Sequence, residues 1–97
     1  MLYDESVRRT DAAIAQVLKR LSDNHLLNNS IVVITADHGE LLGEHGLFGH
    51  ATDMFEPEIR VPLVMSVPGY NGRVIDTPAQ LLDIFPTVSD LTGVHTR

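Results

Sequence analysis

The sequence contains no cysteine, so disulfide bonds, thiolate zinc sites and a cysteine nucleophile are excluded within its 97 residues. It contains no apolar run that approaches the ~20 residues of a membrane-spanning helix, so we expect no membrane span. Basic residues are also few, and seven Lys and Arg against 13 Asp and Glu give a formal net charge of −6. That balance argues against a nucleic-acid partner, which needs a basic surface, and against binding to an anionic membrane surface.

Hydrophobic periodicity and turn residues divide the chain, which has about the length of one small domain, into five segments. The predicted segments are a helix over 4–21, a strand over 31–35, a long loop over 36–60, a strand over 61–67 and a helix over 78–92. This order of helix, strand, long loop, strand and helix predicts an α/β fold whose two apolar strands are covered on both faces. Because two strands are too few for an independent sheet, we expect a further part of the chain or a second copy to cover them. The second strand runs antiparallel to the first if the loop stays at one edge of the sheet, and parallel if the loop crosses back.

The long loop begins with Asp37 and His38, directly after the carboxyl end of the first strand, where open α/β sheets bind their ligands. An Asp beside a His offers an oxygen and a nitrogen donor, a combination that suits Mn, Zn, Fe or Mg. In a functional interpretation these residues bind a divalent metal, and His50 is a second ligand or a donor to an anionic substrate. In the alternative interpretation the loop is a polar surface whose histidines are solvated. His45 is interpreted as a loop-packing or solvated residue.

Other polar residues also have two interpretations each. Glu56 and Glu58 either orient the metal ligands from behind or form a solvated face that pairs with Arg60. Arg60 either binds an anion or forms a structural salt bridge to a loop glutamate. His25, in a turn, and His95, in the tail, are interpreted as solvated.

Three stretches of the sequence strongly resemble motifs in the C-terminal part of the sulfatase family, within the alkaline phosphatase superfamily. They occur in the same order as in that family. They are SIVVITADHGELLGEHGLFGH, EPEIRVPLVMSVPG and LLDIFPTVSDLTGV. The preceding YDESVRRTDAAIAQVLKRL is similar to the helix before the metal-binding strand of those enzymes. The resemblance covers residues 3–94, and three motifs in order are far more specific than a lone Asp-His-Gly. It implies that residues 1–97 form a partial sulfatase-like catalytic domain, a fragment of an alkaline-phosphatase-like sandwich.

The resemblance also implies roles for individual residues. Asp37 and His38 match the family's late pair of metal ligands; many sulfatases have Asn at the second position, and a His is similar to phosphonate and phosphodiester hydrolases of the superfamily. His50 falls where many members have a Lys that contacts the sulfate or phosphate. It is therefore a candidate both for substrate binding and for catalysis, as the acid that assists the leaving group. The implied cofactor is a divalent metal, with Ca or Mn as first candidates and Mg or Zn as alternatives.

The nucleophile of sulfatases is a formylglycine hydrate made within a C/S-x-P-S-R motif, and this sequence contains neither that motif nor the early aspartate pair of the metal site. We therefore expect a fragment of a sulfuric ester hydrolase that supplies metal ligands and a substrate-facing histidine and is inactive alone. The alternatives are a segment of a phosphodiester or phosphonate monoester hydrolase, or a non-catalytic fragment that associates with itself. The expected partners are a small sulfate or phosphate ester and further copies of the fragment.

Overall fold

The computed structural model describes residues 2–50 and 54–94, and its contacts divide the chain into two compact units. The first unit comprises Met1–Val32 with Ser66–Tyr70, and the second comprises Val33–Met65 with Asn71–Arg97. The candidate site residues of the long loop all belong to the second unit. The tail histidine His95 lies outside the described residues. Within 2–50 and 54–94, no helix is long and apolar enough to cross a membrane.

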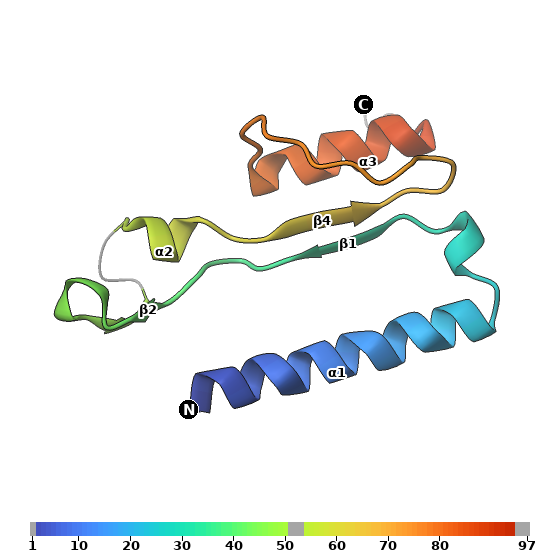
Figure 1. Cartoon of the computed structure of the whole chain (residues 1–97). Helices are drawn as coiled ribbons and strands as arrows, with labels where there is room; N and C mark the ends of the chain where they lie inside the picture. Colours follow the sequence, from blue (N-terminus) through green and yellow to red (C-terminus); the bar gives the residue numbers. More distant parts are fainter. Residues whose placement is uncertain (1, 51–53, 95–97) are drawn as a thin grey trace. The chain divides into compact units, whose positions relative to one another are not determined.

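Helix α1 spans Leu2–Asp23 and is two residues longer at each end than the predicted helix over 4–21 (Figure 1). Its C-terminal extension is stabilised by Lys19, whose ammonium lies 2.7 Å from the carboxylate of Asp23 one turn later. Acidic residues lie in the first turn and Arg20 in the last, as the helix dipole favours. The helix therefore follows from local sequence alone.

Strand β1 (Val32–Thr35) and strand β4 (Leu63–Ser66) form a two-stranded sheet. They run in opposite directions (Figure 1), which decides between the antiparallel and parallel alternatives. The hydroxyl of Thr35, the last residue of β1, donates a hydrogen bond of 2.8 Å to the carbonyl oxygen of Pro62, just before β4. Strand β4 starts two residues later than predicted, because Pro62 has no N–H to donate to a sheet ladder.

The segment predicted as a loop over 36–60 contains regular structure that its sequence pattern does not indicate. Strand β2 (Leu41–Leu42) pairs antiparallel with β3 (Phe48–Gly49) in a tight hairpin. Helix α2 follows over Glu56–Ile59, with Pro57 in its first turn, where a missing N–H breaks no helical hydrogen bond. Strands this short are too brief for an alternating pattern, so periodicity cannot find them.

Helix α3 spans Ile84–Thr92 and is preceded by a 3₁₀ turn over Leu81–Asp83, so the predicted helix over 78–92 starts too early. The helical turns start later than predicted because the N-terminal capping residue is Gln80. The backbone N–H of Gln80 donates to the Asp83 carboxylate at 2.8 Å, and the Gln80 side chain caps the backbone in return.

Pro86 near the start of α3 and Gly93 at its end both suit the backbone conformation of their positions. Pro86 lies in the first turn of α3, where its missing N–H removes no helical hydrogen bond. Gly93 ends the helix with a left-handed φ of 69°. A glycine in this conformation is a common end of an α-helix.

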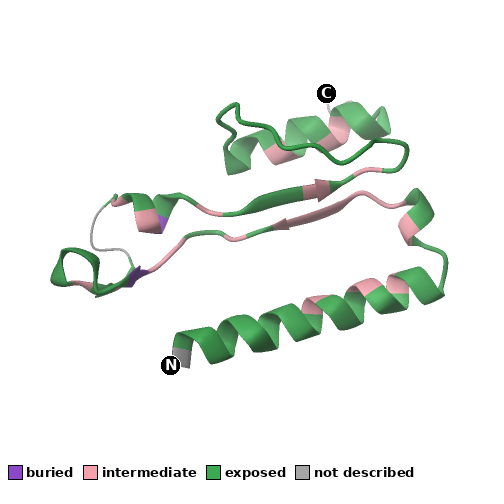
Figure 2. Cartoon of the chain, in the orientation of Figure 1, coloured by how far each residue is buried: buried purple, intermediate pink, exposed green. Residues whose placement is uncertain are grey.

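Burial is sparse among the described residues, and Leu41 is the one apolar side chain that is fully buried there (Figure 2). Most of β1 is half-buried, whereas β4 is mostly exposed and Val64 is 59% exposed. The expectation that both strands are covered on both faces is therefore not met by residues 2–50 and 54–94. The chain is a mixture of helices and small antiparallel sheets, consistent with the α/β class.

Candidate functional site

The register of the β2–β3 hairpin places Glu40 opposite His50. Leu41 pairs with Gly49, so the next opposed pair outward consists of residues 40 and 50. Side chains that lie directly opposite each other in an antiparallel pair are close enough to interact. The Nδ1 atom of His50 indeed lies 2.7 Å from Oε1 of Glu40.

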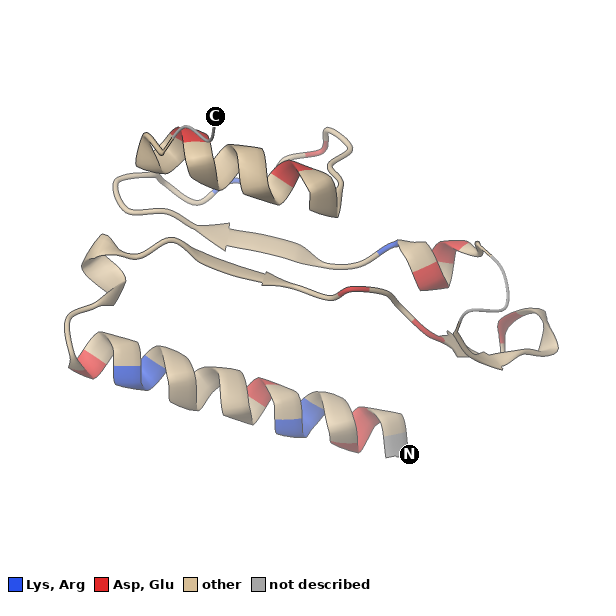
Figure 3. Ribbon diagram, turned by 180° about the vertical axis from the view of Figure 1, so that it is seen from behind, with Lys and Arg blue, Asp and Glu red and all other residues tan. Residues whose placement is uncertain are grey.

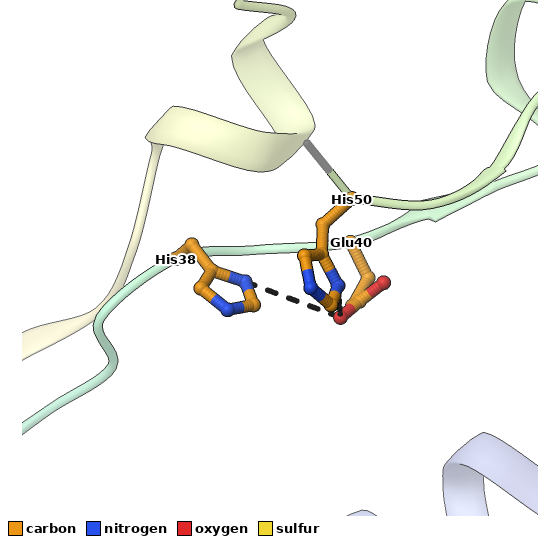
Figure 4. Close-up of side chains that lie close together, drawn as sticks. All are labelled: His38, Glu40 and His50. Carbon is orange, nitrogen blue, oxygen red and sulfur yellow. Dashed lines mark hydrogen bonds and ion pairs between the residues drawn. The ribbon is translucent and has the colours of Figure 1, made fainter. Parts of the chain in front are cut away.

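His38 joins this pair because alternate residues of an extended segment point to the same side. It precedes Glu40 by two positions, and its ring centroid lies 4.2 Å from that of His50, with a tilt of 34° between the rings. Its Nδ1 lies 4.0 Å from Oε1 of Glu40. Figure 4 shows both imidazoles beside the one carboxylate. One ligand atom from each of the three residues lies within 4.8 Å of the others, so the group could hold a metal ion.

The hydrogen bonds of the two imidazoles fix which nitrogen carries the proton. A carbonyl or a carboxylate oxygen only accepts, so Nδ1 of His38 donates to the Gly39 carbonyl at 3.0 Å, and Nδ1 of His50 donates to Glu40. In a neutral ring the lone pair then lies on Nε2, which is free to bind a metal. The hydrogen bond to Gly39 also raises the pKa of His38 above its ordinary value; desolvation opposes this shift and the charge of Asp37 adds to it.

Asp37 lies at the edge of this group, and its side chain is 89% exposed. Its Oδ1 accepts a 3.0 Å hydrogen bond from the backbone N–H of His38, which is the main cause that lowers the pKa of Asp37. Its Oδ2 lies 3.8 Å from Nε2 of His38. Two donors that share a metal at about 2.1 Å each lie about 3.0–4.2 Å apart, so these two atoms fit one divalent cation.

Gly39 brings helix α2 against the site. Its N–H donates a 2.7 Å hydrogen bond to the carbonyl oxygen of Glu58. Thr35 bonds to Pro62, and Gly39, four residues after Thr35, bonds to Glu58, four residues before Pro62. The two segments therefore stay antiparallel beyond the sheet. A Cβ on Gly39 would clash with the backbone carbonyl oxygen of Pro57, so only glycine fits here.

Glu58 is neither solvated nor paired with Arg60, which corrects one of its two interpretations. It is 5% exposed, and its Oε2 has no hydrogen-bond partner among the described residues. Its charge contributes to the raised pKa of His38, so it acts on the site electrostatically. A buried carboxylate oxygen without a donor is unfavourable, and a cation at the site would supply the missing positive charge.

Two other residues of the long loop are accounted for by packing. His45 lies outside the three-residue group, and its ring stacks on Phe55 with centroids 4.1 Å apart, as expected of a loop-packing residue. The guanidinium of Arg60 lies 2.9 Å from the carboxylate of Glu56, the predicted salt bridge to a loop glutamate. Neither observation gives these residues a part in the site.

The charge of the segment around the site favours a cation. Residues 36–60 contain Arg60 as the single Lys or Arg and six carboxylates, namely Asp37, Glu40, Glu44, Asp53, Glu56 and Glu58. In Figure 3 the described ones follow one another from the end of β1 through the hairpin to α2. This negative charge and the oxygen and nitrogen donors of the same segment both favour a divalent cation as ligand.

Glu44 is expected to make the hairpin sensitive to acid. Its carboxylate accepts the N–H of Leu42 at 2.6 Å, and this bond lowers the pKa of Glu44 below 4.5. The stabilisation is fully present above pH 4.5 and is lost as the pH falls through the lower pKa of the folded hairpin. The amide proton shift of Leu42 should therefore change in one step below pH 4.5. Glu44→Gln should abolish that step, and a step that persists in this variant would contradict the assignment.

Glu40 is the site residue that the sequence pattern did not single out. Asp37 and His38 stand out because they follow a strand, and His50 because it ends a glycine-rich run. The available signal for Glu40 was its spacing of two from His38 combined with the GLFG stretch that returns the chain to His50. That signal can be used only once the hairpin and its register are known.

Comparison with known proteins identifies the family of this chain. The family model described as Sulfatase matches residues 1–94. Arylsulfatase K of Danio rerio is 42% identical over 93 residues, and choline-sulfatase of Rhizobium meliloti (strain 1021) is 32% identical over 92 residues. Each alignment covers 95% of this chain and 18% of the relative, so the chain spans less than a fifth of the length of these relatives. No solved structure gives a significant match. The chain belongs to the sulfatase family.

Proposed function

We propose that this chain forms part of the active site of a metal-dependent sulfuric ester hydrolase, within a sandwich of the alkaline phosphatase type. The observation that carries the proposal is the gathering of Asp37, His38 and His50 past the carboxyl end of β1, in a chain of the sulfatase family. The element order supports the fold assignment, since the segment places a strand, the site and a returning strand in sequence. The chain would supply part of the site, and a nucleophile would come from outside these residues.

Asp37 and His38 are the proposed metal ligands, through Oδ2 and Nε2. The Gly39 carbonyl holds the proton of His38 on Nδ1, and the N–H of His38 keeps the Asp37 carboxylate ionised, so both donor atoms are prepared for a cation. A divalent metal, when bound, supplies Lewis-acid stabilisation of the sulfate oxygens and activates the nucleophile. Ca or Mn are the first candidates, and Mg or Zn remain as alternatives.

His50 is the proposed substrate-facing residue. Its Nδ1 donates a hydrogen bond to Glu40, and Nε2 is therefore the ring nitrogen that is available to a substrate. When the ring carries a proton on both nitrogens, Nε2–H either donates a hydrogen bond to a sulfate oxygen or gives its proton to the leaving oxygen of the ester. The substrate would be a small sulfate ester.

The metal assignment is tested by Mn²⁺ titration of the 97-residue chain, followed by paramagnetic broadening of its NMR signals. We expect weak binding, with a dissociation constant above roughly 10⁻⁴ M, because two adjacent ligands form only part of a site. Broadening should centre on Asp37 and His38, and it should disappear in the double variant Asp37→Asn, His38→Gln. The matched control is Asp11→Asn on α1, which should leave the pattern unchanged. Broadening centred elsewhere, or tight stoichiometric binding, would argue against this assignment.

The phosphoryl branch of the superfamily is the alternative reaction class, and the presence of histidine at both positions 38 and 50 favours it. In this alternative the same residues would act on a phosphodiester or a phosphonate monoester. The two classes differ in the nucleophile, which lies outside these residues. A formylglycine motif in the partnering segment would support sulfate ester hydrolysis, and a Ser or Thr nucleophile in another context would support phosphoryl chemistry.

Self-association is a further proposal for the chain when it is alone. Several large apolar side chains of the second unit are exposed, among them Val64, Phe48 at 77% and Phe85 at 65%. Such surfaces favour association with a second copy or with the rest of a larger domain. Size-exclusion chromatography separates these cases, since a monomer would argue against self-association.

A further inference from the structure

Glu40 holds the shortest contact in the group of His38, Glu40 and His50. Its Oε1 lies 2.7 Å from Nδ1 of His50. Two ligand atoms bound to one ion at about 2.1 Å each are separated by about 3.0 Å or more. The contact is therefore of hydrogen-bond length and too short for two atoms that bind the same cation. Oε1 of Glu40 is engaged with His50, and it does not act as a third ligand beside it.

The hairpin fixes this contact from both sides. Leu41 is fully buried and pairs with Gly49, which sets residues 40 and 50 opposite each other. The backbone N–H of Gly43 donates to the Leu47 carbonyl at 2.9 Å and closes the turn in the same register. A shift of the strand register by one residue would turn the side chain of Glu40 away from His50. The hydrogen bond between them therefore depends on this strand pairing.

The orientation of His50 follows from the partner on Nδ1. A carboxylate accepts the Nδ1 proton and favours the tautomer in which Nε2 keeps its lone pair. The ring of His50 also lies against that of His38 at 4.2 Å, which restricts rotation about its side-chain bonds (Figure 4). Glu40 is about half as exposed as His50, at 28% against 51% of the side chain, so its carboxylate is the less solvent-accessible group of the pair.

We propose that Glu40 is a positioning residue that accepts a hydrogen bond from Nδ1–H of His50 and makes Nε2 the single nitrogen of His50 directed to the sulfate ester, where it donates once the ring has gained a second proton. The role given to Nε2 rests on the proposed function, whereas the tautomer itself does not. Carboxylates behind histidines commonly fix the ring and its tautomer in this way. Glu40 thus differs from Asp37, whose carboxylate is free to reach a cation.

The tautomer of His50 is measured directly by correlation of its ring nitrogens and protons in the NMR spectrum of the full 97-residue chain. The buffer should be alkaline enough for an ordinary imidazole to be neutral, with no metal or substrate present. We expect the proton of His50 on Nδ1 in the unsubstituted chain. In Glu40→Ala the ratio of Nδ1–H to Nε2–H tautomers should fall by about tenfold, because the charged acceptor is gone.

Two further variants separate positioning from a general effect of charge or folding. Glu40→Gln retains an amide oxygen that accepts from Nδ1, so it should restore most of the Nδ1–H tautomer. Glu56→Gln removes the same charge from a residue that pairs with Arg60, and it should leave His50 unchanged. The ring signals of His45 serve as the reference within the same loop.

The result that would overturn the proposal is a proton on Nε2 of His50 in the unsubstituted chain, or a tautomer ratio that Glu40→Ala does not change. Neither measurement involves hydrolysis or a metal. Absence of sulfatase activity when this segment is placed in a complete sulfatase would therefore count against the proposed function alone, and an Nε2–H tautomer would count against Glu40 alone.

Discussion

Asp37→Ala is expected to abolish hydrolysis of an aryl sulfate when this segment is placed in a complete sulfatase. The experiment replaces the 93 matching residues of Danio rerio arylsulfatase K with the corresponding residues of this chain. Removal of a residue that supports a metal ligand typically lowers activity by about 10- to 100-fold. Because Asp37 is itself a proposed ligand, we expect its removal to lower kcat/KM by at least about 100-fold. The assay follows release of 4-nitrophenol from its sulfate ester.

The controls distinguish loss of a ligand from loss of the fold. Asp11→Ala makes the same chemical change on the exposed surface of α1 and should retain activity within about twofold. The 97-residue chain alone should release no 4-nitrophenol, since it contains no nucleophile motif. An active hybrid that tolerates Asp37→Ala would remove Asp37 from the metal site. Turnover by the pure chain would refute the proposal that it supplies only part of a site.

Gly39→Ala is expected to separate helix α2 from the site. The added Cβ would meet the backbone carbonyl of Pro57, which has no flexible end that can move away. Overpacking costs about 1–3 kcal/mol, and the hydrogen bond from residue 39 to Glu58 contributes about 1 kcal/mol. Amide exchange at residue 39 should accelerate by about 30-fold or more, the factor that corresponds to 2 kcal/mol.

Gly72→Ala is the matched control, because a Cβ at Gly72 has no atom within 4 Å. It should leave amide exchange at residue 39 unchanged. The same spectra report whether the contact between residue 39 and Glu58 persists. If Gly39→Ala keeps slow exchange and this contact, the close approach in the structure is not required and the argument from sterics fails.

Local sequence determines the helix at the N-terminus and the place of the proposed metal ligands. The residues of α1 repeat at helical spacing with suitable charges at both ends, so its prediction needs no distant contact. Asp37 and His38 follow an apolar strand, and a strand end is a place where α/β sheets present side chains to ligands. The three family motifs are equally a property of the sequence, and they identify the sulfatase family without any knowledge of the geometry.

The start of the last helix was harder to predict because two caps compete in the sequence. Thr77 with Gln80, and Gln80 with Asp83, both have the spacing of a capping box. The structure uses the second pair, so the helical turns begin after Gln80. Local pattern offers both choices, and only the path of the chain before the helix selects between them.

Only the tertiary structure decided which side chains meet. Strands of two residues have no periodicity, so the sequence shows neither the β2–β3 hairpin nor its register. That register places Glu40 opposite His50, and the extended backbone then brings His38 to the same side. Burial of Glu58 depends in the same way on the approach of α2 to Gly39. Contacts between residues distant in the chain depend on register and close packing, whereas the chemistry of each residue is fixed by its identity.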